Sequence, residues 1–192
     1  MYWSGIAGVD EAGRGPLAGP VVAAAVILPD NFPISGLKDS KQLSLKERNF
    51  FYALIKCKAI AFAVGMVDSE EIDRLNIYWA TYKAMAIAIR GLSVAPERIV
   101  VDGNRIVPEI DIPQEAIVKG DTTHPSIMSA SVIAKVTRDR WMDKIHQRFP
   151  EYGFRSHKGY STATHLKALK QHGPTPIHRK SFAPVRVLLE VE

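Results

Sequence analysis

Several features common in other protein classes are missing from this sequence of 192 residues. It holds one cysteine, Cys57, which excludes an internal disulfide and a zinc site built on several cysteines. The longest apolar stretch runs from Val21 to Leu28 and is too short to span a bilayer. The N-terminus has neither the basic start nor the apolar run of a signal peptide, so we expect a cytoplasmic protein. We expect Cys57 to pack as a small hydrophobic side chain.

Internal repeats and low-complexity tracts are also missing, and the six histidines show no close pairing of the zinc-protease kind. What remains is an ordinary globular composition, with 46% hydrophobic residues and a mean hydropathy of -0.04. The length fits one domain. The net charge of +5 favours polyanionic ligands mildly, but many basic proteins bind no nucleic acid.

One stretch, residues 8–16, concentrates the unusual chemistry. Asp10 and Glu11 follow an apolar approach, and a charge within a strand is costly unless it is paired or metal-bound. Neighbouring strand residues point to opposite faces, so a local bend is expected if both acids hold one divalent ion. Gly13 and Gly15 permit close approach of the backbone to a ligand, and Arg14 suits a phosphate. An acidic strand end followed by a glycine turn is an equally good interpretation of this stretch alone.

The same glycines fit a loose dinucleotide-binding fingerprint, Gly13-x-Gly15-x-x-Ala18. That fingerprint must open a helix whose N-terminus holds a pyrophosphate. Here Pro16 and a β-type run follow the glycines, and two acids precede them. We therefore reject a dinucleotide-dependent oxidoreductase.

Alternating apolar patterns, caps and turn residues predict the secondary structure. Ser44 and Glu47 form a capping box, Gly91 ends a helix, and Pro125 occupies the first position of another helix. We expect Tyr78, Trp79 and Tyr82 in the core more readily than as a base-stacking platform. The predicted strands are 5–11 and 19–28 as a hairpin, 59–67, 98–102 and 116–118, and the predicted helices are 44–56, a short one from 68, 77–89, 126–148 and a last one from 161 or 162 to 171.

Four acids stand at predicted strand ends or turns, namely Asp10, Glu11, Asp102 and Asp121. Each alone is weak evidence, since aspartate is common in turns. Together they suit hard divalent ions, because Mg²⁺ takes oxygen ligands and keeps several waters. Acids at one site repel phosphate unless metals intervene, so acids with basic neighbours suggest metal-assisted phosphodiester chemistry. The basic candidates near glycines and turns are Arg14, Lys119, Lys158 and Arg179, while Lys135, Arg138 and Arg140 could face a ligand or line a solvated helix face.

Several motifs in a fixed order identify a family resemblance. They are Gly8-Val9-Asp10-Glu11-Ala12-Gly13-Arg14-Gly15-Pro16, Asp39-Ser40-Lys41, Asp102-Gly103, Lys119-Gly120-Asp121, Ser129-Ala130-Ser131, the run from Ala134 to Asp139, Gly159-Tyr160 and the run from His178 to Phe182. With these motifs the sequence resembles ribonuclease HII over nearly its whole length.

The resemblance implies a ribonuclease H-like α/β fold, a mixed central β-sheet flanked by α-helices, in a single catalytic domain over residues 1–192. It implies an endoribonuclease that cleaves the RNA strand of RNA–DNA hybrids and nicks 5′ of single ribonucleotides embedded in duplex DNA. The implied mechanism is two-metal-ion hydrolysis with Mn²⁺ or Mg²⁺, leaving 3′-hydroxyl and 5′-phosphate ends, in support of ribonucleotide removal from DNA. We expect a monomer with no membrane partner.

The resemblance also assigns roles to residues. Asp10, Glu11, Asp102 and Asp121 would hold the metals. Gly13, Arg14 and Gly15 look like the loop that recognises the 2′-hydroxyl, the group that separates RNA from DNA. Tyr160 looks like the ring that packs on the sugar at the RNA-to-DNA junction, and Lys41 joins the substrate-binding residues.

A few positions depart from the family pattern. Ser161 and Ala163 replace a usual proline and lysine, Gln42 replaces a lysine, and Lys180 stands for an arginine. The acids are unaffected, so the departures concern substrate affinity and the loop around Tyr160. The short tail after Phe182 predicts a weaker or more salt-sensitive grip on the duplex.

A second function class is a basic nucleic-acid-binding module without catalysis. Its weakness is the four acids, which would oppose binding of a polyanion without a compensating role. Metal dependence separates the two classes, because a simple binder should tolerate a chelator.

Overall fold

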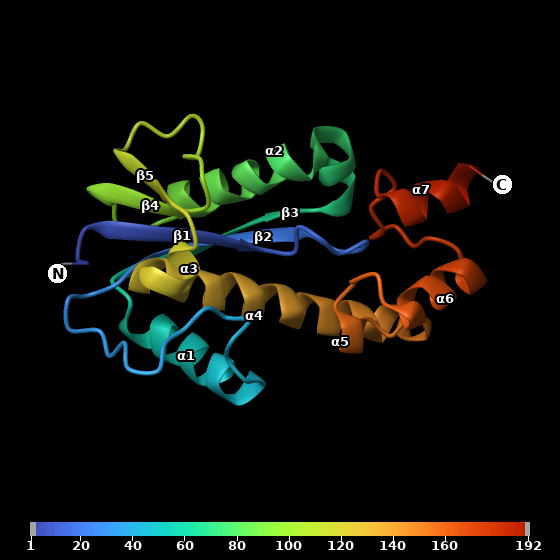
Figure 1. Cartoon of the computed structure of the whole chain (residues 1–192), viewed down its shortest axis with the longest axis horizontal. Coiled ribbons are helices and arrows are strands. Elements are labelled where there is room, and N and C mark those ends of the chain that lie inside the picture. The colour runs from blue at the N-terminus through green and yellow to red at the C-terminus, as the bar shows by residue number, and fades with distance from the viewer. Residues whose placement is uncertain (1–2, 191–192) are drawn as a thin grey trace.

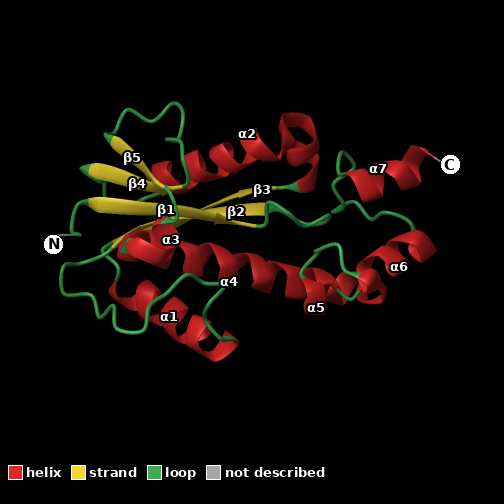
Figure 2. Ribbon diagram, in the orientation of Figure 1, coloured by secondary structure: helices red, strands yellow, loops and turns green. Residues whose placement is uncertain are grey.

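The computed structural model describes residues 3–190. Its centre is a mixed five-stranded sheet with the strand order β3-β2-β1-β4-β5 (Figure 2). The neighbours β1–β2 and β2–β3 are antiparallel, whereas β1–β4 and β4–β5 are parallel. The predicted hairpin and all five predicted strands are confirmed. Their bounds are β1 Ile6–Ala12, β2 Val21–Ile27, β3 Ala61–Val67, β4 Arg98–Asp102 and β5 Gln114–Ile117.

Helices cover both faces of this sheet. Helix α2 lies on one face and α4 on the other, with α1 packed outside α4, while α5, α6 and α7 extend beyond the end of the sheet (Figure 1). The helices are α1 Leu45–Lys58, α2 Ser69–Arg90, α3 Gly120–Thr123, α4 Pro125–Arg148, α5 Phe154–His157, α6 Ala163–His172 and α7 Ala183–Glu190, and a 3₁₀ turn spans Pro150–Tyr152.

The apolar run of β2 is buried on both sides, which explains why it is continuous rather than alternating. Val21 and Ala23 pack in the cluster beneath α2, and Val22 and Ala24 pack in the cluster beneath α4. A third cluster joins the far end of α4 to the C-terminal helices. The last cluster fixes the C-terminal segment against the chain that follows β1.

The predicted helix ends are confirmed where capping chemistry is local. The Ser44 capping box is formed in both directions, and Pro125 stands in the first turn of α4. Helix α2 contains a break at Asn76, whose φ of 65° is uncommon for a residue other than glycine. The break separates the two helical segments that the sequence predicts.

Three expectations were wrong or incomplete. Cys57 is exposed, because it lies away from the buried face of α1 marked by Phe51 and Ile55. Helix α7 follows the helix that we expected to be the last. Trp79 is exposed and Tyr78 is only partly buried, so the expectation that these rings lie in the core holds only for Tyr82, which packs against the core beneath α2. Within residues 3–190, no helix is both long and apolar enough to cross a membrane.

The closest contact between β1 and α4 depends on Gly8. A Cβ atom at this position would lie 2.1 Å from the carbonyl carbon of Ser126 and 2.3 Å from the amide nitrogen of Ile127. We expect Gly8→Ala to lower the free energy of unfolding by about 3 kcal/mol, because backbone atoms cannot yield as a flexible side chain does. Urea unfolding would measure it.

Gly15→Ala is the matched control for this stability measurement. The nearest atom to a Cβ at Gly15 is a ring carbon of Tyr160 at 3.6 Å, an ordinary contact. Equal midpoints for the two variants would contradict the close approach of α4 to β1.

Candidate active site

The four acids predicted from the sequence meet at one edge of the sheet. Asp10 and Glu11 lie near the end of β1, and Asp102 ends β4, which is the parallel neighbour of β1. Asp121 lies in the first turn of α3, and its amide donates a hydrogen bond to Oδ1 of Asp102 at 3.2 Å. The carboxyl ends of parallel strands therefore bring together acids that are 111 residues apart in the sequence, from Asp10 to Asp121.

The carboxylates of this cluster affect one another's pKa values. Burial raises the pKa of Asp10 well above its usual range, and the charges of Glu11 and Asp102 raise it further. Burial also raises the pKa of Glu11, with Arg14 opposing the shift and Asp102 adding to it. The pKa of Asp121 is raised by burial and then by Asp102. Such a group of buried carboxylates is stable in its charged form only with positive charge between the oxygens.

The donor set fits a hard divalent cation. All four side chains offer carboxylate oxygens, which Mg²⁺ and Mn²⁺ prefer to softer ligands. Within residues 3–190, no three histidine, cysteine or acidic side chains stand in an arrangement that would by itself hold a metal ion. An open set of carboxylates suits an ion that completes its shell with water and with substrate oxygens.

Lys41 lies at the rim of the acids. Its Nζ is 3.7 Å from Oδ2 of Asp121, and 76% of its side chain is exposed. Burial is the largest single effect on the pKa of Lys41 and lowers it, but the nearby carboxylates, Asp39 first, together outweigh burial and raise the pKa. The exposed ammonium group is therefore charged and accessible to a polyanion.

A small polar group supports Lys41 and Asp10 from below, and the sequence analysis gave it no role. Asp39 is buried, and its Oδ1 accepts hydrogen bonds from the amide of Lys41 at 3.1 Å and from Oγ of Ser131 at 3.4 Å. The Ser131 hydroxyl also lowers the pKa of Asp10, in opposition to the larger effect of burial. Ser131 lies on the face of α4 that packs on β1, a position that helical spacing from Ile127 could have indicated.

The glycine loop after β1 is held by two buried arginines. Arg179 is completely buried and donates to the carbonyl oxygens of Gly13 at 2.5 Å, Arg14 at 2.8 Å and Gly19 at 2.9 Å. Arg138 donates to the carbonyls of Pro20, Lys158 and Ala18. Burial lowers the pKa of Arg179 to about 9 and that of Arg138 to about 10. Arg138, which could face a ligand or line a solvated helix face, is buried and binds backbone carbonyls, and it also lines the recess in front of the glycine loop. Arg179, a basic candidate near a turn, likewise binds backbone carbonyls.

The other predicted basic residues lie in different settings. Lys158 pairs with Asp143, and Lys135 pairs with Asp139 at 2.8 Å, so both lysines have partners on α4. Lys119 is exposed in a left-handed conformation with a φ of 58°. The cations nearest the acids are thus Lys41 and Arg14, whose Nη1 is 3.5 Å from Oε1 of Glu11.

Tyr160 faces the glycine loop across a recess. The recess has a volume of about 180 Å³ and joins Glu11, the loop from Gly13 to Gly15, Lys41 and Tyr160. The amide of Leu17 donates to the carbonyl of Gly159 at 2.8 Å, which ties the two segments together. This one recess is lined by all the residues that the sequence analysis assigned to substrate binding, namely Gly13, Arg14, Gly15, Lys41 and Tyr160.

The comparison with known proteins decides the family, because the sequence matches Ribonuclease HII over residues 7–185. The chain belongs to the ribonuclease HII family. It is a metal-dependent endoribonuclease of ribonuclease H type 2. The family also accounts for the mixed sheet, which is that of the ribonuclease H-like fold.

Three relatives show how far the likeness to ribonuclease HII extends. The ribonuclease HII of Acidovorax sp. (strain JS42) is 57% identical over 185 residues, covering 96% of this chain and 88% of the relative. That of Burkholderia ambifaria is 57% identical over 186 residues, covering 97% and 85%. The crystal structure of the ribonuclease H2 from Pyrococcus horikoshii OT3 superposes with a TM-score of 0.82 at 30% identity, covering 97% of each chain.

In this ribonuclease HII chain, three histidines connect the Tyr160 loop to the Arg179 turn. The amide of Thr175 donates to Nδ1 of His178 at 2.9 Å, so the proton of neutral His178 is on Nε2. That proton is donated to Nε2 of His165 at 3.0 Å, and Nδ1 of His165 then donates to the carbonyl of Tyr160 at 2.8 Å. His157 stacks on His165 with ring centroids 4.5 Å apart. A second proton on His178 would point its Nδ1–H at the amide N–H of Thr175, and a second proton on His165 would point its Nε2–H at the Nε2–H of His178. Either protonation would therefore replace a hydrogen bond with a contact between two donors.

This relay makes stability fall at acid pH. Burial, then the charge of His165, lowers the pKa of His178 from 6.5 to about 4. Between these values the unfolded state binds more protons than the folded state, so stability is lost as pH falls through this window. We expect a loss of about 3 kcal/mol from pH 7 to pH 4 from this side chain.

Urea unfolding at several pH values would measure this loss. His178→Asn should flatten the profile, whereas the exposed His172→Asn should leave it unchanged. An unaltered profile in His178→Asn would rule out this source of acid sensitivity.

Proposed function

We propose that this enzyme cleaves the RNA strand of RNA–DNA hybrids and nicks 5′ of single ribonucleotides in duplex DNA. The observation that carries the proposal is the recess that joins Glu11 to the Gly13–Gly15 loop and Tyr160. It places groups suited to a ribose directly beside carboxylates suited to a metal. As a family member, the enzyme would serve the removal of ribonucleotides from DNA in the cytoplasm, acting as a monomer with one catalytic domain over residues 1–192.

Asp10, Glu11, Asp102 and Asp121 are proposed to hold two Mg²⁺ or Mn²⁺ ions. When bound, such ions supply an activated water and stabilise the leaving oxygen. The carboxylates would fix the ions beside the scissile phosphate, and two of them, Asp10 and Asp121, are buried. Lys41 and Arg14 offset the negative charge of substrate and acids at the rim. The products carry 3′-hydroxyl and 5′-phosphate ends.

Recognition of the ribonucleotide is assigned to the backbone of the Gly13–Gly15 loop. The Arg179 guanidinium occupies the carbonyls of Gly13 and Arg14, which fixes how the loop faces the recess. A 2′-hydroxyl can both donate and accept, so fixed backbone groups can distinguish it from a hydrogen atom. The exposed ring of Tyr160 would pack on the next sugar toward the 3′ side.

Gly15→Ala tests the loop without disturbing the fold. The added methyl group would enter the recess near the ring of Tyr160, where the substrate sugar is proposed to lie. We expect kcat/KM for a duplex with one ribonucleotide to fall about tenfold or more, with the unfolding midpoint unchanged. Normal cleavage by this variant would separate the loop from substrate recognition.

The cleavage reaction itself is tested with a labelled DNA duplex that contains one ribonucleotide. The purified protein is incubated with Mg²⁺, Mn²⁺ or a chelator, and the products are sized on a denaturing gel. A metal-dependent cut on the 5′ side of the ribonucleotide supports the proposal. Retained binding with no cut under either metal would favour the non-catalytic binding module instead.

A further inference from the structure

A second recess opens beside the acids and is separate from the one that contains Tyr160. It has a volume of about 100 Å³ and shares Glu11 and Arg14 with the first recess. Asp102 also lines it, so it reaches the acid cluster from the side of β4. The two recesses therefore meet at Glu11 and Arg14, and Asp102 lines only the second.

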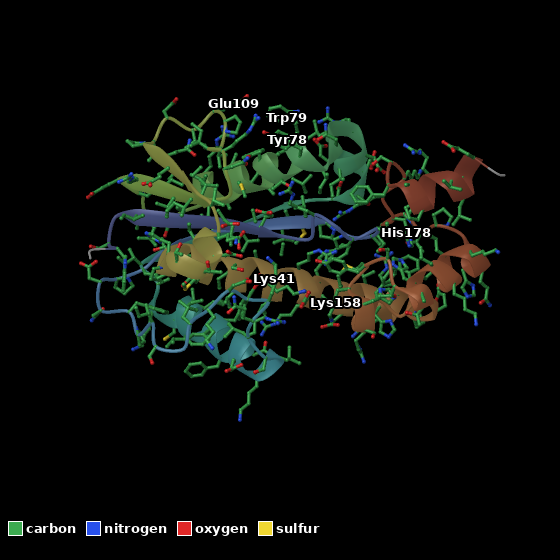
Figure 3. The ribbon with its side chains drawn as sticks, in the orientation of Figure 1. Lys41, Tyr78, Trp79, Glu109, Lys158 and His178 are labelled. Carbon is green, nitrogen blue, oxygen red and sulfur yellow. The ribbon has the colours of Figure 1, made fainter. Side chains whose placement is uncertain are left out.

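The outer wall of this second recess is aromatic. Tyr78 and Tyr82 come from α2, and Asn104 comes from the segment after β4. The rings of Tyr78 and Tyr82 pack edge to face with centroids 5.0 Å apart. Figure 3 places Tyr78 and Trp79 on the α2 side of the sheet and Lys41 on the α4 side. The aromatic wall thus stands across the sheet edge from Lys41.

The break in α2 fixes this wall. Asn76 adopts a φ of 65°, and its Oδ1 accepts hydrogen bonds from the amides of Tyr78 at 3.0 Å and Trp79 at 3.2 Å. The side chain of Asn76 therefore caps the second helical segment, and Tyr78 lies in its first turn. A non-glycine residue in this region is costly unless the surroundings impose it. The hydrogen bonds of Asn76 help to offset this cost, and the break places an aromatic turn next to the acids where a continuous helix would otherwise run.

Positive charge lies on the rim of the same recess. The guanidinium of Arg105 stands over the ring of Tyr78 at 5.9 Å, and Arg105 is exposed. The pKa of Tyr82 is raised by burial and by Tyr78, and Arg105 and Arg14 both oppose that shift. Arg14 lines the same recess, so two arginines flank the pair of tyrosines. Tyrosine rings with adjacent arginines are suited to a sugar and its phosphate.

We propose that this recess binds the nucleotide on the 5′ side of the cut, the one that leaves with the new 3′-hydroxyl. Tyr78 and Tyr82 contact its sugar, and Arg105 contacts the phosphate one linkage upstream of the scissile phosphate. The polarity rests on the proposed function, in which Tyr160 takes the sugar on the 3′ side. If the 3′ side of the cleaved strand lies in the recess of Tyr160, its 5′ side continues past the acids into the recess of Tyr78.

The test removes the negative charge of one phosphate from the substrate and the positive charge of Arg105 from the protein. Cleavage under single-turnover conditions is compared for a normal duplex and for one with a neutral methylphosphonate at the linkage immediately upstream of the scissile phosphate. The wild type should lose about tenfold in kcat/KM on the modified duplex, the size expected for one charge-assisted contact. Arg105→Ala should lose about tenfold on the normal duplex and show no further loss on the modified one, because the two changes remove the same contact.

Controls make the result specific to this recess. Arg98→Ala removes an exposed arginine at the start of β4, the opposite end of that strand from Asp102, where it pairs with Glu115. It should cleave both duplexes as the wild type does. A methylphosphonate ten linkages upstream should have no effect on any variant. Arg105→Ala should also lower the slope of log affinity against log salt by about 1.

The outcomes separate the two proposals. If the wild type fails to cut the normal duplex, the proposed function is wrong. If the wild type cuts the normal duplex but the losses from Arg105→Ala and from the methylphosphonate multiply, the contact does not exist and the recess is not the upstream subsite. Loss of the methylphosphonate effect in Arg105→Ala, with normal coupling in Arg98→Ala, supports the subsite.

Discussion

Asp10→Asn is expected to abolish cleavage while the protein still binds an RNA–DNA hybrid. Asp10 is 4% exposed, the least of the four acids, and the charges of Glu11 and Asp102 both act on it. Asparagine keeps its shape and removes the charge that would hold a metal ion. Losing several kcal/mol of transition-state stabilisation corresponds to a rate decrease on the order of a thousandfold.

The same substitution should not weaken the fold. Burial and two neighbouring carboxylates disfavour the charged form of Asp10, so a neutral amide relieves repulsion in the metal-free protein. We expect the thermal midpoint at pH 7, measured with a chelator, to stay the same or rise. Loss of activity with loss of stability would instead indicate a damaged fold.

Binding and cleavage are measured on one substrate. Fluorescence anisotropy of a labelled hybrid gives the affinity, and single-turnover assays give the rate. Asp111→Asn is the matched control, because Asp111 is an exposed residue of the loop before β5. It makes the same chemical change and should leave both quantities unaltered. Cleavage near the wild-type rate in Asp10→Asn would contradict the assignment of this acid.

The positions of the four acids follow from local signals in the sequence, whereas their role as metal ligands stays a prediction. An acid that ends an apolar strand, as Asp102 does, is recognisable without knowing the fold, and the parallel pairing of β1 and β4 then brings it to Asp10. Helix ends follow the same logic, since the Ser44 capping box involves residues only three positions apart. The exposure of Cys57 could also have been predicted from the sequence, because Phe51 and Ile55 mark the buried face of α1 and Cys57 does not share their helical spacing.

Other parts of the site depend on contacts between distant segments and could not be predicted. Arg179 lies in a basic tail that suggests a polyanion, yet its partners are carbonyls about 160 positions earlier in the chain. His165 and His178 carry no metal-binding spacing, and the fold alone brings their rings together. The role of Asp39 likewise depends on Ser131, 92 positions away.

Arg179→Ala should destabilise the protein by about 3–5 kcal/mol. The guanidinium is fully buried and has hydrogen bonds to carbonyls of Gly13, Arg14 and Gly19, so its removal leaves several buried acceptors without donors. The loss also leaves a cavity beside the ring of Phe182, 5.0 Å from the guanidinium. Urea unfolding measures the effect, and Lys180→Ala, an exposed neighbour, should change the midpoint very little.

Arg179→Lys tests the role in positioning the loop when the alanine variant unfolds too readily. Lysine keeps the charge, but it cannot reproduce a planar fork that reaches carbonyls of Gly13, Arg14 and Gly19 at once. The folded variant should retain metal-dependent cleavage while losing discrimination between a ribonucleotide and a deoxyribonucleotide. A structural role alone would lower stability without altering that ratio. An unchanged ratio in a folded Arg179→Lys protein would therefore show that the loop does not need this arginine to recognise the 2′-hydroxyl.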